Sequence, residues 1–271
     1  MSRSSHIITK PPQDQADGLR RLFTASKVRF VPVVSNPNVA GSSALLEALC
    51  RGFAELGLNT LVVDAGETSP AADELASVDL ASCIERLSRE VSYVAARGLP
   101  MRHLNSKGSA ASFLEALTQA APQAEVVLLH AGAAELARVV ASREVRPVLL
   151  ADLETASITH AYASMKWLSG RAGLMVYSLL LAANPQLRAA GQIAQRIGSC
   201  GDGFLGAVLR DWACFDPKNP PSAPLPDEIR HLCRELLAVA PPGVALQASG
   251  ADAAPLRPLA PPRYSFLAAA I

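Results

Sequence analysis

The chain has 271 residues, of which 50% are hydrophobic, 18% charged and 5% aromatic. A chain of this length and composition can bury a substantial core, which excludes a wholly disordered protein. With 25 Lys and Arg against 24 Asp and Glu, the formal net charge is +1, so the positive field that general nucleic-acid binding needs is missing.

The cysteines and the apolar runs indicate in which cellular compartment the protein is found. Five cysteines are spread along the chain with no CxxC pair and no histidine at zinc-ligand spacing, which predicts reduced thiols, mostly buried, and no metal site. The start, MSRSSHIITK, lacks the apolar core of a signal peptide. The richest apolar run, Leu174 to Ala183, is about half the roughly 20 residues that span a membrane. We therefore expect a cytoplasmic protein.

Residues 1–27 are predicted to form an N-terminal arm. Within it, the segment DQADGLRRLF at 14–23 predicts a short helix with charged flanks. The apolar residues that share one face of this helix are Ala16, Leu19, Leu22 and Phe23. Such a helix could either pack on the core or dock on a partner.

Residues 28–240 are predicted to form the core, because short apolar runs alternate there with amphipathic stretches. The runs predict strands at 31–35, 60–64, 125–130, 145–151, 174–181 and 205–212. The stretches predict helices at 42–56, 109–120, 133–142, 155–168, 185–197 and 227–239. This order predicts a single α/β domain with a mainly parallel, doubly wound sheet, in which ligands bind beyond the carboxyl ends of the strands.

Prolines mark the end of the core. Five lie between Pro217 and Pro226, and six more between Pro241 and Pro262. Residues 241–271 are therefore predicted to be a Pro-rich, disordered tail. The helix at 227–239 has an apolar stripe with few basic residues beside it, so we expect it to pack on the core rather than on lipid.

The turn at 35–43, SNPNVAGSS, opens directly into a helix and so stands where a phosphate-binding loop would lie. Such a loop, GxxxxGK[ST], uses glycines to wrap phosphates, a lysine to neutralise them and a hydroxyl to bind magnesium. Here Asn36 stands at the first glycine and Ser42 at the lysine, whereas Gly41 and the hydroxyl of Ser43 match. Without the cation we predict no catalytic residue and either no cofactor or weak binding of ATP and Mg²⁺.

The succession of strand, loop and helix, followed by LNTLVVDAG at 58–66, resembles the MinD/ParA branch of P-loop ATPases, whose loop reads KGGVGKT. Against that pattern Pro37 replaces the signature lysine. Asp64 matches the first aspartate of the family's DxD motif, and Gly66 replaces the second. A later strand that ends in aspartate in the family ends here in His130. These joint changes indicate a chain that keeps the fold without turning over ATP.

Two of these positions have structural interpretations as well as catalytic ones. A lone histidine at the end of a buried strand is expected to be a hydrogen-bonded structural group rather than a base. Asp64 is expected to hydrogen-bond to the backbone of the loop at 35–43 rather than to bind magnesium.

Two segments are similar to the FlhG (FleN) proteins, MinD-like regulators of flagellar number. DQADGLRRL at 14–22 resembles their N-terminal DQAxGLRRL, and ETASITHAYASMKWLS at 154–169 resembles their PTSITDAYALIKVLS, with His160 in place of the aspartate. The resemblance runs from about residue 13 to about residue 220. It implies the MinD-like fold for the core and a regulatory function in flagellar biogenesis.

In the FlhG family the N-terminal helix docks on FlhF, a signal-recognition-particle-type GTPase, and stimulates its hydrolysis of GTP. The resemblance implies that Gln15 reaches the nucleotide site of this partner and that Asp14, Leu19 and Arg20 contact it. A flagellar transcriptional regulator or a component of the switch complex is a further candidate partner, and a homodimer is left open.

Two other functions remain as alternatives. The first is a weak MinD-like ATPase that dimerises on ATP and associates peripherally with the inner membrane or the cell pole. It would need another cation, such as Lys107 or Arg171, in place of the missing lysine. The second is an interaction module unrelated to flagella.

Overall fold

The computed structural model describes residues 28–141 and 143–238, which form one α/β domain around an eight-stranded sheet. The strand order is β3-β4-β2-β5-β1-β6-β7-β8, with every neighbouring pair parallel except the antiparallel pair β3 and β4. The strands are β1 (Arg29–Val34), β2 (Thr60–Ala65), β3 (Glu85–Arg86), β4 (Val91–Ala95), β5 (Val126–Ala131), β6 (Val148–Ala151), β7 (Val176–Ala182) and β8 (Val208–Phe215).

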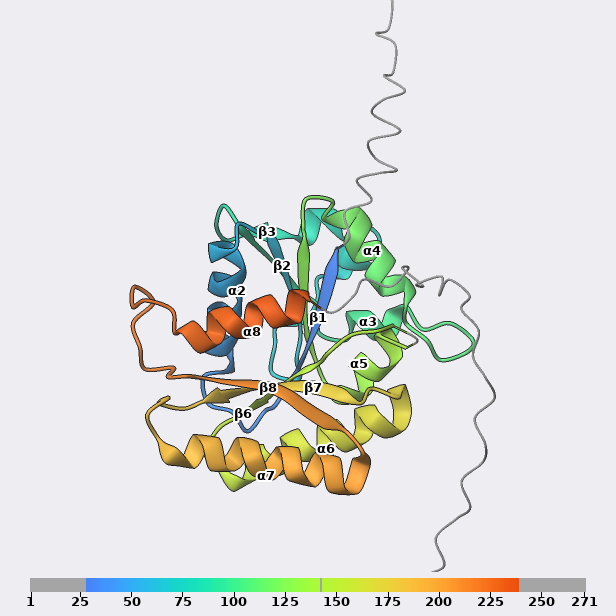
Figure 1. Ribbon diagram of the computed structural model, residues 1–271. Helices are drawn as coiled ribbons and strands as arrows, with labels where there is room; N and C mark the ends of the chain where they lie inside the picture. The colour runs from blue at the N-terminus through green and yellow to red at the C-terminus, as the bar shows by residue number, and fades with distance from the viewer. Residues whose placement is uncertain (1–27, 142, 239–271) are drawn as a thin grey trace, which may run out of the picture.

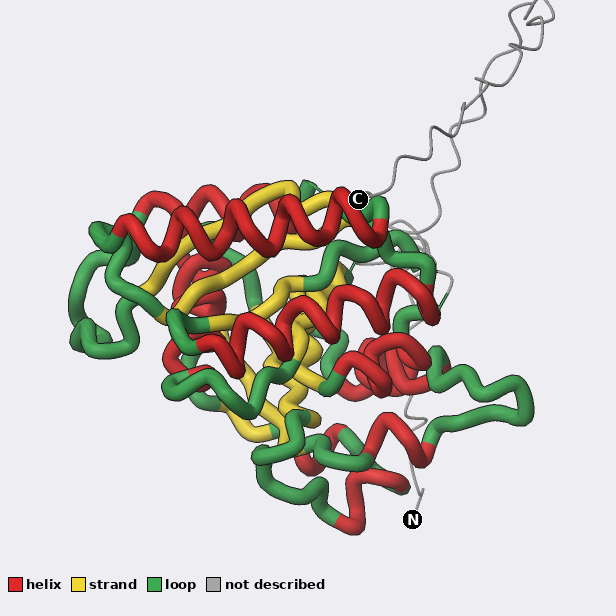
Figure 2. Tube along the Cα trace, turned by 90° about the horizontal axis from the view of Figure 1, so that it is seen from below, coloured by secondary structure: helices red, strands yellow, loops and turns green. Residues whose placement is uncertain are grey.

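Helices cover both faces of this sheet (Figures 1 and 2). The α-helices are α2 (Ser42–Glu55), α3 (Leu99–Arg102), α4 (Ser112–Ala120), α5 (Ala133–Val139), α6 (Thr155–Ala172), α7 (Arg188–Leu205) and α8 (Asp227–Leu237). Short 3₁₀ turns, η1 (Glu74–Ser77) and η2 (Ala81–Cys83), lie between β2 and β3. One apolar cluster joins the sheet to α4, α5, α6 and α7, and the other joins the opposite face to α2 and α8. The sheet is therefore the middle of three layers, as the sequence predicted.

The central strands of the sheet are buried on both faces. All six residues of β5 and five of the six in β2 are buried, in keeping with apolar runs that do not alternate. On one face, α8 buries Ile229, Leu232, Cys233 and Leu236, which confirms the prediction that its apolar stripe packs on the core. In the described ranges no helix combines the length and the hydropathy needed to cross a bilayer.

Helix α7 is longer than predicted. The sequence predicts that this helix ends at residue 197 and that a strand begins at residue 205, whereas α7 continues to Leu205 and β8 begins at Val208. Glycines caused the error, since they usually interrupt helices. Here Gly201 serves close packing: a Cβ at this position would lie 2.8 Å from the sulfur of Met165 on α6. The glycine lets the two helices approach each other.

Two other predictions were wrong or incomplete. The helix predicted at 133–142 ends at Val139. Strands β3 and β4 were not predicted at all, because β3 has two exposed residues and β4 is mostly half-buried, so neither gives a strong apolar signal.

Candidate functional site

The carboxyl ends of β2 and β5 bring together two polar side chains that are 66 residues apart in the chain. Parallel pairing places Asp64 level with His130. The Nδ1 atom of His130 lies 2.7 Å from Oδ1 of Asp64, and the two side chains are 6% and 17% exposed. A short contact between largely buried groups of this kind fixes both side chains.

Three further groups bind the same carboxylate. The hydroxyl of Ser69 donates to Oδ1, the hydroxyl of Tyr93 lies 3.4 Å from Oδ2, and the backbone N–H of Gly66 lies 3.4 Å from Oδ1. Burial alone would raise the pKa of Asp64, but the hydrogen bonds from His130 and Ser69 outweigh it, and the pKa is lowered. Asp64 is thus held as a carboxylate by donors from its own chain.

Gly66, which stands at the second aspartate of the DxD pattern, fits tightly under this cluster. A Cβ on Gly66 would lie 2.8 Å from Cε1 of His130 and 2.9 Å from the hydroxyl oxygen of Ser69. Real Cβ contacts are essentially never this short. An aspartate at position 66 therefore requires both His130 and Ser69 to move away.

These contacts revise the expectation for Asp64. The backbone N–H that it accepts from is that of Gly66, not one in the loop at 35–43, so the predicted bond to that loop was wrong. The histidine is bonded to Asp64 through Nδ1, as expected of a structural group, while its buried Nε2 has no partner among the described residues.

The loop at 35–43 is pinned to the sheet by its own asparagine. Asn36 is 3% exposed, and its Nδ2 donates to the carbonyl oxygens of Leu150 at 2.8 Å and of Ser157 at 2.9 Å. Its Oδ1 accepts the backbone N–H of Asn38 at 3.1 Å. Asn36 therefore ties the loop to the end of β6 and the first turn of α6.

A distant segment approaches the second half of the loop at Gly41. Gly41 has φ of +85°, and a Cβ there would lie 3.0 Å from Cβ of Pro217, which follows β8. Val39 is buried, whereas Ser42 and Ser43 begin α2 and are half-buried and exposed, respectively. The loop therefore approaches Pro217 at Gly41, while Pro37, Asn38, Ala40 and Gly41 stay exposed.

A nucleotide with magnesium, bound as the MinD/ParA resemblance implies, does not fit these residues. The loop contains no Lys or Arg to offset phosphate charge. The amide of Asn36 and the carboxylate of Asp64 are already engaged by protein groups. In the described ranges no group of three or more His, Cys, Asp or Glu could hold a metal ion, and the five cysteines are free thiols.

Of the two candidate replacement cations, Arg171 lies far from the loop, and the contact given for Lys107 is within its own segment. Arg171 is in the last turn of α6 and stacks on Trp167 at 5.3 Å, whereas the turn of α6 that touches Asn36 contains Ser157. Fourteen helical residues separate these turns by about 21 Å. Lys107 lies in the segment between α3 and α4, where its backbone N–H binds Asn105.

The partner-contact residues predicted in the N-terminal arm, Asp14, Gln15, Leu19 and Arg20, lie outside the described residues.

A cavity of about 630 Å³ that the sequence did not predict opens at the same edge of the sheet, on the side of α5 and α6. Trp167 and His160 of α6 line it, together with Arg97 and the acidic pair Glu67 and Glu135. Burial and then the nearby Glu67 raise the pKa of Glu135, although a hydrogen bond from the backbone of Gly132 opposes this. Much of the remaining lining is alanine and glycine, residue types that carry no chemical signal in a sequence.

No protein-family model and no curated protein sequence matches the chain. Among solved structures, apo McdA from Cyanothece aligns with a TM-score of 0.55 and 12% identity over 78% of this chain and 99% of that one. The MinD cell division protein of Aquifex aeolicus aligns with a TM-score of 0.53 and 14% identity over 78% and 97%. A Cyanothece McdA variant in complex with ATP gives 0.52 and 12% over 80% and 98%. The described domain therefore has the fold of the MinD/ParA P-loop NTPases.

Proposed function

We propose that this protein is an FlhG-like regulator of flagellar biogenesis whose MinD-type core no longer hydrolyses ATP and whose N-terminal motif acts on an FlhF-type GTPase. The observation that carries the proposal for the core is the state of Asp64. Its carboxylate is hydrogen-bonded to His130 and Ser69. These two side chains also occupy the space that an aspartate side chain at position 66 would need. A carboxylate saturated in this way is not available to a metal-bound nucleotide.

The motif DQADGLRRL at 14–22 supports the proposal for the partner. A glutamine on a short amphipathic helix can orient a water molecule or a phosphate oxygen in another protein's nucleotide site. The core would then act as a scaffold, and the partner would supply the nucleotide chemistry. Location at a cell pole or at the inner membrane would follow from the partner.

The partner half of the proposal is tested by GTP turnover. The full-length protein, mixed with an FlhF-type GTPase, is expected to raise the rate of phosphate release, and Gln15→Ala is expected to abolish the increase. Gln13→Ala is the matched control, since Gln13 lies two residues earlier and outside the motif. No stimulation by the native protein, or equal stimulation by both variants, would contradict the proposal.

A weak ATPase is the second candidate, and one feature of the structure favours it. Lys218 directly follows Pro217, which lies beside Gly41, so the backbone of a lysine lies close to the loop in the segment after β8. Calorimetry with ATP and Mg²⁺ separates the two functions. Micromolar binding and phosphate release that Lys218→Ala removes, while Lys107→Ala keeps them, would establish the ATPase. The scaffold predicts no heat of binding at these concentrations.

A further inference from the structure

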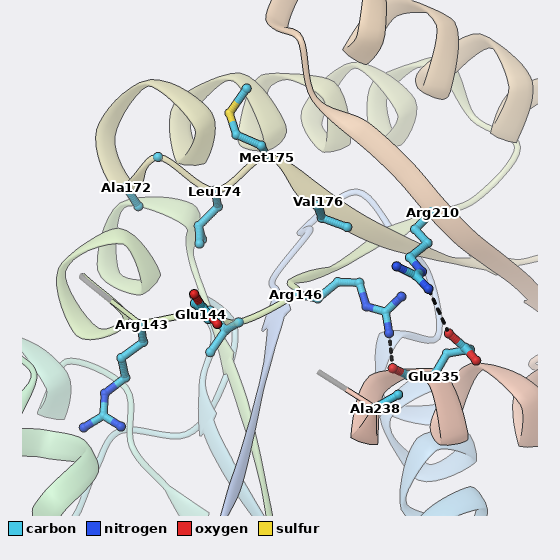
Figure 3. Close-up of a pocket in the computed structure, with 12 residues that line it drawn as sticks. Arg143, Glu144, Arg146, Ala172, Leu174, Met175, Val176, Arg210, Glu235 and Ala238 are labelled. Atoms are coloured by element: carbon cyan, nitrogen blue, oxygen red, sulfur yellow. Dashed lines mark hydrogen bonds and ion pairs between the residues drawn. The ribbon is translucent and has the colours of Figure 1, made fainter. Parts of the chain in front are cut away.

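A groove with a cavity of about 410 Å³ lies at the amino-terminal edge of the sheet, opposite to the loop at 35–43 (Figure 3). It lies between the segments that enter β6 and β7, the start of β8 and the end of α8. Its apolar lining residues are Val145, Ala172, Leu174, Met175, Val176 and Ala238.

The floor of the groove leaves aliphatic side chains uncovered among the described residues. Met175 and Val176 are each 40% exposed. Val176 pairs with Val208, which is 50% exposed, and Phe204 at the end of α7 is 80% exposed. Single exposed apolar residues are ordinary, but exposed apolar residues in the lining that continue into Val208 indicate a surface that another segment covers.

The groove is also lined by five charged residues, Arg143, Glu144, Arg146, Arg210 and Glu235. Because Arg146 and Arg210 already pair with carboxylates and Glu144 adds a negative charge, an anion is a poor occupant. Arg146, which is 5% exposed, binds Asp211 at 2.5 Å and also donates to the backbone oxygen of Glu235. Arg210 lies 3.8 Å from the carboxylate of Glu235 (Figure 3). The buried Nε of Arg146 has no acceptor among the described residues. An uncharged, apolar chain with free backbone carbonyls fits these surroundings better than a phosphate.

The chain itself supplies such a segment. Ala238, the last described residue, is part of the lining, so residue 239 begins at the groove. The sequence that follows, VAPPGVAL at 239–246, has no charged residue. The charged residues in the whole segment 239–271 are Asp252, Arg257 and Arg263. Eight extended residues reach about 26 Å, enough to cross a groove of this volume. We propose that residues 239–246 lie in this groove and cover Met175 and Val176.

The competing occupants are less suited to the surface. The arm helix at 14–23 carries two aspartates and two arginines, and its apolar face is the one that the proposed function gives to a partner. A second copy of the chain would have to enter the groove against a segment tethered at its rim, whose effective concentration is high.

The test uses cysteine labelling in the full-length chain. The exposed Cys200 and the half-buried Cys83 are replaced by serine, the three buried cysteines are kept, and Met175→Cys places a thiol in the groove. In this background, Val244→Asp with Leu246→Asp is compared with Leu256→Asp and Leu259→Asp, a matched pair farther along the same tail. The first pair is expected to speed maleimide labelling of residue 175 about tenfold, and the second to leave it unchanged.

Every other result overturns the proposal. Equal rates in all chains would show that the groove is open, and acceleration by the distal pair would assign it to another part of the tail. Acceleration by Leu19→Asp with Leu22→Asp would assign it to the arm, and a rate that falls with protein concentration would assign it to a second copy. Leu75→Cys, at a position 62% exposed on η1, reports any general loosening. Hydrogen exchange at 172–178 in chains with native cysteines provides the same comparison without the added thiol.

Discussion

At the carboxyl edge of the sheet, buried polar side chains are hydrogen-bonded within the domain, whereas the amino edge carries apolar side chains that the described residues leave partly exposed. At the first edge, Asn36, Asp64 and His130 are engaged within the domain. At the second, Met175 and Val176 are 40% exposed beside the last described residue. Ligands of doubly wound folds bind at the carboxyl edge. In this chain Asn36, Asp64 and His130 at that edge are engaged by protein groups beside a cavity with a charged lining, and the surface suited to an apolar segment lies at the other end of the strands.

Restoring the lost aspartate should disturb the carboxyl edge most. Gly66→Asp pushes a Cβ into His130 and Ser69 and adds a second carboxylate beside Asp64. We expect the free energy of unfolding, measured by urea titration, to fall by roughly 3 kcal/mol. Gly66→Asp with His130→Ala should recover much of this loss because the imidazole no longer obstructs position 66. A single variant as stable as the native chain would show that the site is open.

The next largest effect is expected from the asparagine of the loop. Asn36→Ala leaves the carbonyl oxygens of Leu150 and Ser157 without their donor and should lower the free energy of unfolding by about 2 kcal/mol. Asn38, two residues on, is exposed and serves as the control. Asn38→Ala should change stability by no more than about 0.5 kcal/mol. Equal effects of the two variants would mean that Asn36 does not hold the loop closed.

A smaller effect should depend on pH. Hydrogen bonds lower the pKa of Asp64 in the folded state from its ordinary 3.8, so they stabilise the fold above that value, and this contribution is lost as pH falls through the folded-state pKa. Ser69→Ala removes one of these donors. At pH 6 it should be about 1 kcal/mol less stable than the native chain, and the difference should shrink below pH 4. A difference that is constant from pH 6 to pH 3 would contradict this role for Ser69.

The sequence predicted the layers of the fold better than the contents of its edges. Apolar runs such as 60–64 and 125–130 carry their own burial signal, so the sheet and its helices could be foreseen. The sequence also showed that the loop lacks a lysine. It could not show that His130 is hydrogen-bonded to Asp64, because the two residues are brought together only by the register of β2 and β5. Nor could it locate the amino-edge groove, whose lining comes from four separate segments.

The smallest expected effect distinguishes a covered amino edge from an open one. Val176→Ser replaces two methyl groups by a hydroxyl on a side chain that is 40% exposed, so on an open surface the free energy of unfolding should hardly change. If residues 239–246 cover Val176, the same change should cost about 1 kcal/mol in the native chain and nearly nothing when Val244→Asp and Leu246→Asp are present. The difference between these two values is the coupling energy of the contact, and a double-mutant cycle isolates it from effects on folding that both backgrounds share. A coupling energy of zero would mean that residues 239–246 do not contact Val176 and that the amino edge of the sheet is open.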